Sequence, residues 1–125
     1  MGRPITTSGF YAILIGVLLL IQGIWNLIDP PFLGIFTSNL LHAVIHIILG
    51  LAGIWYGRKG TAFGYCLFLG ILLLAVGILY YIEVVGKILE ELFNLNTPVV
   101  WLNIGIGLLS LFMAFAVGRN RRYEI

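Results

Sequence analysis

Four long uncharged runs constrain the fold of this chain more than any other feature. They cover about residues 9–28, 38–57, 61–82 and 98–118, and none contains Asp, Glu, Lys or Arg. A helix of about 20 apolar residues crosses the hydrocarbon core of a bilayer. Inside that core a helix satisfies its own backbone hydrogen bonds. The sequence therefore predicts an all-α integral membrane protein, with four spans in a single membrane domain over residues 1–125.

The composition agrees with lipid as the solvent. Hydrophobic residues make up 61% of the 125 residues and charged residues only 10%, whereas a soluble domain carries about 25% charged residues. In water such a chain would expose large apolar patches. No long basic stripe is present, so nucleic acid is not an expected partner. Cys66 is the only cysteine, which excludes an internal disulfide and a multi-cysteine metal cage.

The charges between the runs predict the orientation of the chain. One set of connections and ends carries one acidic residue, Glu124, and six basic residues, namely Arg3, Arg58, Lys59, Arg119, Arg121 and Arg122. The other connections carry Asp29, Glu83, Glu90 and Glu91 with a single basic residue, Lys87. Lys and Arg are enriched in cytoplasmic loops. We therefore expect both termini in the cytoplasm.

The long connection on the outer side predicts a further short helix over about residues 84–94. Its apolar residues recur at helical spacing: Val84, Val85, Ile88, Leu89, Leu92 and Phe93. Lys87, Glu90 and Glu91 fall on the other side of that helix. An amphipathic helix of this kind lies on a membrane surface. It could serve as a lid or docking surface, or simply as a hydrophobic connector.

The two halves of the sequence resemble each other. The pattern Tyr-x4-Gly-x-Leu-Leu-Leu-x2-Gly-Ile begins at Tyr11 and again at Tyr65. A weaker pattern, Phe-x2-Asn-x6-His/Asn-x3-Gly-Leu, begins at Phe36 and again at Phe93. Each half is then a helical hairpin, and both run in the same direction. We expect a four-helix bundle of two tandem parallel helical-hairpin repeats, related by a pseudo-twofold axis along the membrane normal.

Glycines predict where the helices pack. Many of them recur four or seven residues apart in the sequence. The predicted packing positions are Gly16, Gly23, Gly50, Gly53, Gly57, Gly70, Gly77 and Gly107. Small residues on one helix face let backbones approach closely in lipid. These faces could pack inside one chain or between copies in a homo-oligomer.

A few polar residues inside the runs are the candidates for chemistry. His42 and His46 are four residues apart and so share one helix face. The rise of a helix places other polar residues at similar depths in the outer half of the bundle. Together they form a candidate polar or ligand site of His42, His46, Asn103, Gln22, Asn26, Asn39 and Glu83.

Three interpretations of the histidine pair stay open. A buried imidazole in lipid needs a hydrogen-bond partner, so the pair could be structural. Ionisable groups inside a membrane also mark pathways, so it could bind a small ligand, an ion or a proton. The third is metal or haem binding, although two zinc ligands need help from Glu83 or from another chain. Haem would need a second chain, because the other runs contain no histidine. No cofactor and no metal ligand is predicted.

The sequence contains no recognisable catalytic constellation. It has no HExxH, no GxSxG, no phosphate loop and no pair of carboxylates inside the runs. Ser110 lies deep in the last run without a histidine at its depth. We therefore expect no enzymatic activity and no catalytic residues.

The most specific motif carries a family resemblance. From Leu33 the sequence reads Leu-Gly-Ile-Phe-x2-Asn-x2-His-x3-His-x3-Gly-x2-Gly, followed by a short basic turn and Tyr-x4-Gly. This stretch resembles a family of small four-span prokaryotic membrane proteins, domain of unknown function forty-three eighty-three, over about residues 10–118. The family often has a second Asn-x2-His-x3-Gly element in its fourth span, where this chain has Val99 and Asn103. The resemblance implies the architecture and a prokaryotic cytoplasmic (inner) membrane as the host, but no activity.

The leading hypothesis is a non-enzymatic structural or accessory membrane subunit. Its expected partners are the lipid bilayer and either further copies of the chain or a larger membrane complex. The first alternative is an oligomeric transporter or channel for a small molecule or ion that uses the polar layer. The second alternative is metal or haem binding through the histidine pair.

Overall fold

The computed structural model describes residues 7–29 and 32–117, which form five α-helices. They are α1 (Thr7–Ile28), α2 (Leu40–Lys59), α3 (Ala62–Leu79), α4 (Glu83–Phe93) and α5 (Thr97–Val117). Within these residues there is no β-strand, only an isolated bridge between Phe32 and Phe36. All helices except α4 are long and apolar enough to cross a membrane. The prediction of an all-α chain with four apolar helices of membrane-spanning length is confirmed.

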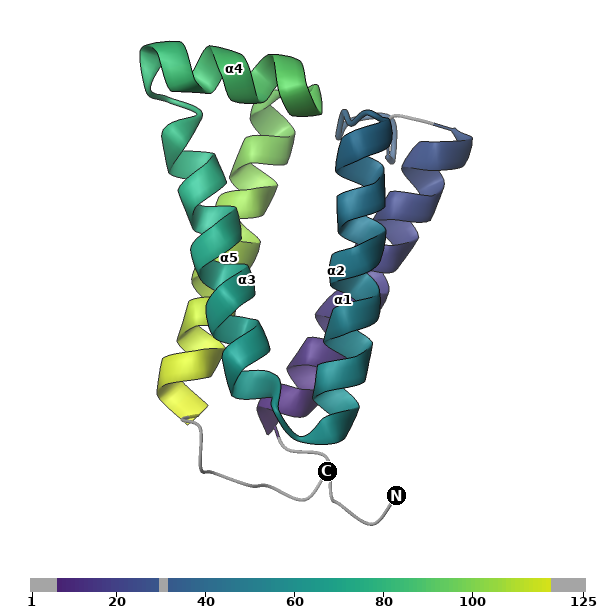
Figure 1. The fold of residues 1–125 in the computed structure, drawn as a ribbon, viewed down its shortest axis with the longest axis vertical. Helices are drawn as coiled ribbons and strands as arrows, with labels where there is room; N and C mark the ends of the chain where they lie inside the picture. The colour runs from purple at the N-terminus through teal and green to yellow at the C-terminus, as the bar shows by residue number, and fades with distance from the viewer. Residues whose placement is uncertain (1–6, 30–31, 118–125) are drawn as a thin grey trace.

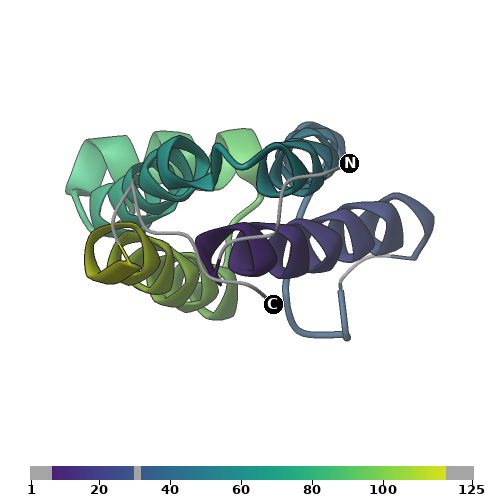
Figure 2. The same cartoon turned by 90° about the horizontal axis from the view of Figure 1, so that it is seen from below.

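The four long helices form two hairpins that lie side by side. Figure 1 shows α1 packed against α2 and α3 packed against α5, with α4 lying across one end of the second pair. Viewed from below, the two pairs stand next to each other (Figure 2). They lie closest where α2 leads into α3 and diverge toward the end that carries α4 (Figure 1). We call these two ends the turn end and the α4 end.

Local sequence explains where the helices begin and end. The side chain of Asn39 accepts a hydrogen bond from the backbone N–H of His42 and so caps the start of α2. Gly60 ends α2 in the left-handed conformation, at φ 87°. Asn94 ends α4 in the same conformation, at φ 52°. Asn96 then caps the start of α5 by accepting a hydrogen bond from the N–H of Val99.

The third helix is shorter than the apolar run that contains it. The run extends to Ile82, but α3 ends at Leu79. Tyr81 and Ile82 donate their backbone N–H groups to the carbonyls three residues earlier, which tightens the chain into a turn. Glu83 then begins α4. Hydropathy alone does not register this change of direction, because Tyr80, Tyr81 and Ile82 are uncharged and continue the run.

Glycines set the separation of α1 and α2. A Cβ atom added to Gly16 would lie 2.6 Å from the carbonyl oxygen of Gly50, and one added to Gly50 would lie 2.5 Å from that of Gly16. Gly23, Gly53 and Gly57 face the opposing backbone at 2.6 to 2.8 Å in the same way. Any larger residue would force the two backbones apart.

The second hairpin uses glycines at the corresponding places. A Cβ atom added to Gly70 would lie 2.9 Å from the carbonyl oxygen of Gly107, and one added to Gly107 would lie 3.0 Å from that of Gly70. Gly77 faces the Ile104 side chain of α5. In the sequence pattern Gly70 corresponds to Gly16 and Gly107 to Gly50, so equivalent residues meet in both hairpins.

Two polar contacts join the hairpins near the turn end. The Tyr11 hydroxyl of α1 lies 2.7 Å from Oγ of Ser110 in α5. The Tyr65 hydroxyl of α3 donates to the carbonyl oxygen of Leu49 in α2, also at 2.7 Å. Around them packs the larger apolar core, which includes the fully buried Leu69 and Cys66. The hairpins are therefore firmly joined in this half of the molecule.

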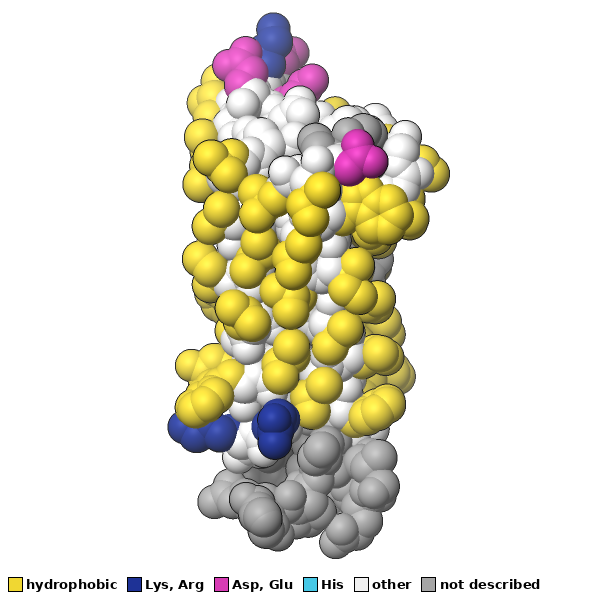
Figure 3. Space-filling view, turned by 90° about the vertical axis from the view of Figure 1, so that its right-hand side faces the viewer, with side chains coloured by type: hydrophobic (Ala, Val, Ile, Leu, Met, Phe, Trp, Pro, Cys, Tyr) yellow, Lys and Arg dark blue, Asp and Glu magenta, His cyan; other side chains and the backbone are white. Residues whose placement is uncertain are grey.

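Charge separates to the two ends of the described structure. Acidic side chains gather at the α4 end together with one basic side chain, Lys87 of α4, and the basic side chains at the turn end have no acidic neighbour in this view (Figure 3). Apolar surface lies between the two ends. Arg58 and Lys59 lie in the last turn of α2, and α4 carries Glu83, Glu90 and Glu91. The remaining basic residues of the orientation argument, Arg3, Arg119, Arg121 and Arg122, lie outside the described residues.

Candidate functional site

The two histidines form one compact pair on the inner face of α2. His42 is 5% exposed and His46 is 3% exposed. Their Nε2 atoms are 3.0 Å apart, and the rings are nearly perpendicular, with an interplanar angle of 89°. One turn of helix separates the residues, so both side chains extend from the same backbone face. The pair is a single polar unit within an apolar surrounding.

The main chain after α4 orients His42. Its Nδ1 atom lies 3.2 Å from the carbonyl oxygen of Phe93. A carbonyl can only accept, so Nδ1 carries the proton and donates it. In a neutral ring Nε2 is then an acceptor, and His46 must donate from its own Nε2. This single contact therefore assigns the tautomers of both rings, and it ties the pair to the other half of the chain.

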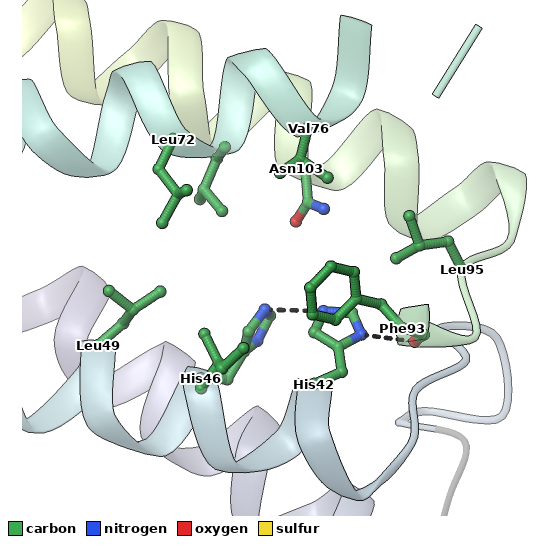
Figure 4. A pocket seen from close by; sticks show the side chains of 10 residues that line it. His42, His46, Leu49, Leu72, Val76, Phe93, Leu95 and Asn103 are labelled. Carbon is green, nitrogen blue, oxygen red and sulfur yellow. Dashed lines mark hydrogen bonds between the residues drawn. The ribbon is translucent and has the colours of Figure 1, made fainter. Parts of the chain in front are cut away.

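A small cavity lies against the pair, between the two hairpins near the α4 end. Its volume is about 90 Å³, and its walls are His42, Ile45, His46, Leu49, Leu72, Leu73, Val76, Phe93, Leu95 and Asn103. That volume has room for about three water molecules. Asn103, from α5, hangs into the cavity from the wall opposite the two rings (Figure 4). The walls are otherwise apolar, so the imidazoles and this amide are its polar features.

Asn103 keeps its amide available to the cavity. Its side chain is 3% exposed, and within residues 7–29 and 32–117 it makes no hydrogen bond. Gln22 is equally buried, and its Nε2 has no hydrogen-bond partner among the described residues. Gln22 is not among the residues that line the cavity, however. The structure thus brings Asn103 to the histidines and leaves Gln22 apart, in α1.

Two more of the predicted residues stabilise chain connections. Asn26 donates from its side chain to the carbonyl of Gln22 and accepts from the N–H of Phe32, which holds the segment after α1 against that helix. Asn39 caps α2 and also donates its side-chain amide to the carbonyl of Leu92 in α4, at 2.7 Å. Neither residue lines the cavity.

Glu83 does not reach the site. It is the first residue of α4, it is exposed, and it is not a wall residue of the cavity. Within the described ranges, no three side chains of His, Cys, Asp or Glu gather at one point. The donors that this region offers to a cation are the two imidazoles and the Asn103 amide oxygen. Both rings extend from one helix, so one chain cannot place them on opposite faces of a haem.

Two features of the site were not predicted from the sequence. The Phe93 carbonyl that orients His42 is a backbone group and leaves no trace in side-chain composition. The second feature is a reciprocal pair of hydrogen bonds. The side chain of Asn96 donates to the carbonyl of Ile35 at 2.7 Å, and the side chain of Asn39 donates to the carbonyl of Leu92. The matched positions of Asn39 and Asn96 in the repeat pattern were the signal for this feature.

Comparison with known proteins finds one matching protein family. Residues 9–116 match the model of one protein family, described as a domain of unknown function (DUF4383). No curated protein matches the chain. No solved structure matches it either. The match covers both hairpins and every residue of the cavity wall.

Proposed function

Because the chain belongs to the DUF4383 family, whose description assigns no activity, we propose a role from its own residues. It is a non-enzymatic integral membrane protein that acts as a structural or accessory subunit. The polar side chains of its described spans mainly bond to other parts of the same chain. Its outward surfaces are apolar and suit lipid or neighbouring helices.

The observation that carries this proposal is the outward face of α5. Four large side chains there are more than half exposed: Trp101, Leu108, Phe112 and Phe115. Gly105 lies on the same face between them, and a Cβ atom added to it would have nothing within 4 Å. A glycine notch between large apolar side chains is the surface that a second membrane helix packs against.

Cysteine crosslinking in native membranes tests the accessory role. Cys66 is fully buried and would first be replaced by alanine. A cysteine introduced as Leu108→Cys should then give a defined crosslink to a second copy or to one larger partner, and Gly105→Leu should abolish it. Phe68→Cys, on the exposed surface of α3, is the matched control and should give no such product. A partner-free monomer at every position would contradict the proposal.

The two hairpins are proposed to be tandem repeats in a four-helix bundle. Support comes from equivalent glycines that meet in both hairpins and from the reciprocal asparagine bonds. Donors Asn39 and Asn96 are 57 residues apart (96 − 39), and so are their acceptors Ile35 and Leu92 (92 − 35). A pseudo-twofold axis along the membrane normal exchanges the two bonds.

Both termini are proposed to lie in the cytoplasm of a prokaryote. Support comes from the separation of charge, with Arg58 and Lys59 at the turn end and the acidic residues of α4 at the other. Single cysteines at Lys59 and Glu91, in the Cys66→Ala background, would be labelled with a membrane-impermeant reagent. We expect only Glu91→Cys to react in intact cells, and labelling of Lys59→Cys instead would reverse the orientation.

A second candidate is an oligomeric transporter or channel. The cavity between the hairpins favours it, because three polar side chains, His42, His46 and Asn103, line a space with room for a small solute. Neighbouring copies would complete the pathway. Liposome flux compared between the native chain and His46→Ala tests this candidate. Equal flux in both and in empty vesicles would exclude it.

A further inference from the structure

We infer that His42 and His46 chelate one borderline divalent transition-metal ion, of the class of Zn²⁺, Ni²⁺ or Cu²⁺, beside the cavity. The inference does not depend on the accessory role. It starts from two imidazole nitrogens that converge on one point. The Nε2 atoms are 3.0 Å apart, and the centroids of the two rings are 4.4 Å apart.

This separation is close to the one that a chelated ion requires. Zinc–nitrogen bonds are about 2.0–2.1 Å long, so two imidazoles on a tetrahedral ion hold their nitrogens about 3.3 Å apart. The observed 3.0 Å needs an opening of a few tenths of an ångström, which small side-chain rotations supply. Histidines four residues apart on a helix are a recurring metal-binding arrangement for the same geometric reason.

The Phe93 carbonyl prepares His42 for this role. Its hydrogen bond from Nδ1 at 3.2 Å keeps the Nε2 lone pair unprotonated and directed at His46. Backbone carbonyls orient metal-bound histidines in this manner. For an ion to enter, His46 transfers its proton from Nε2 to Nδ1, and its Nε2 lone pair then faces the same point. Both rings stay neutral, and no proton is lost overall.

The cavity supplies the remaining coordination. Its volume of about 90 Å³ lies directly against both rings, which leaves room for an ion with about two waters. Asn103 contributes an amide oxygen on the opposite wall (Figure 4). Waters and this neutral oxygen solvate the charge of the ion within the apolar walls.

The donor set also selects the type of ion. No carboxylate lines the cavity, and hard cations such as Mg²⁺ and Ca²⁺ are bound chiefly through carboxylate and other oxygen ligands. Imidazole nitrogen suits zinc, copper and nickel instead. With two protein nitrogens and exchangeable waters, the site keeps open positions and binds its ion reversibly.

Zinc titration of the full chain tests the inference. The protein would be purified in detergent, treated with a chelator, and titrated with Zn²⁺ against a chromophoric competitor. We expect one Zn²⁺ per chain and no binding of Mg²⁺. His42→Gln and His46→Gln should each weaken binding by about 100-fold or more, since losing even a partner of a ligand costs about 10–100-fold. Gln22→Leu removes a buried amide away from the cavity and should leave binding unchanged.

A spectroscopic measurement on the native chain keeps the test independent of variant folding. With Cu²⁺ bound, electron paramagnetic resonance should show hyperfine coupling to two imidazole nitrogens. Absence of stoichiometric Zn²⁺ binding would overturn the inference. So would unchanged binding in both glutamine variants, or a copper spectrum without coupling to nitrogen.

Discussion

The two hairpins share their packing but differ in their chemistry. Gly16 meets Gly50 in the first as Gly70 meets Gly107 in the second. At the depth of the cavity, however, the first hairpin has two histidines in α2, and the second has Val99 and Asn103 in α5. Close helix approach at equivalent glycines therefore occurs in both halves, whereas the buried histidines lie in one half only. The predictions below test this contrast, beginning with the largest expected effect.

Replacing an interface glycine should destabilise the two hairpins by similar amounts. Gly50→Leu and Gly107→Leu each place a side chain against the opposing backbone and should destabilise the detergent-solubilised protein by about 3 kcal/mol. Gly105→Leu, which points into open space, should change stability little. Unfolding in denaturant, followed by tryptophan fluorescence, measures all three. If Gly107→Leu were harmless while Gly50→Leu was severe, the hairpins would not be equivalent.

Asn39 and Asn96 should contribute about equally to the free energy of unfolding. Asn39→Ala and Asn96→Ala each remove a helix cap and a hydrogen bond to the other hairpin, at a combined cost of about 2 kcal/mol. Asn39→Asp and Asn96→Asp keep the cap and lose only the amide donor, so they should cost about half as much. The same unfolding assay measures both pairs. A large inequality between the two halves would argue against the pseudo-twofold relation.

The chemical difference can be reduced by one substitution. Asn103→His gives the second hairpin a histidine at the position equivalent to His46 and facing the pair across the cavity. A third imidazole should tighten zinc binding by about tenfold or more. Competitive titration measures the change. Unaltered affinity would show that residue 103 does not share an ion with the pair.

The smallest effects should come from the tyrosines near the turn end. Tyr11→Phe removes the bond to Ser110, and Tyr65→Phe removes the bond to the Leu49 carbonyl. Each should cost about 1 kcal/mol, the usual net value of one hydrogen bond. Neither should alter zinc binding, because neither residue lines the cavity. A change in zinc affinity in either variant would mean that the two ends of the molecule are coupled.

The sequence was sufficient for the four long helices because their constraint is local. An uncharged run of about 20 residues needs only its own backbone to satisfy its hydrogen bonds in lipid. It was less informative at the turn after Leu79, where the apolar run continues to Ile82 while the backbone changes direction. There the outcome depends on hydrogen bonds between main-chain groups, which hydropathy does not encode.

The candidate site was predictable only in part. Helical spacing brought His42 and His46 together, and helical rise put Asn103 at the right depth. Depth does not define which face a residue occupies, and for that reason Gln22 and Glu83 were grouped with residues they do not join. The Phe93 carbonyl required the three-dimensional path of the chain after α4. Packing between helices therefore decides which of the polar residues at one level become neighbours.

The reciprocal bonds of Asn39 and Asn96 also bear on ancestry. A symmetric dimer of two identical short hairpins would form this one contact twice, once from each subunit. Duplication and fusion of a gene for one such hairpin would keep both contacts in a single polypeptide. Covalent linkage would then free each copy to change alone, so that one could retain paired histidines while the other lost them.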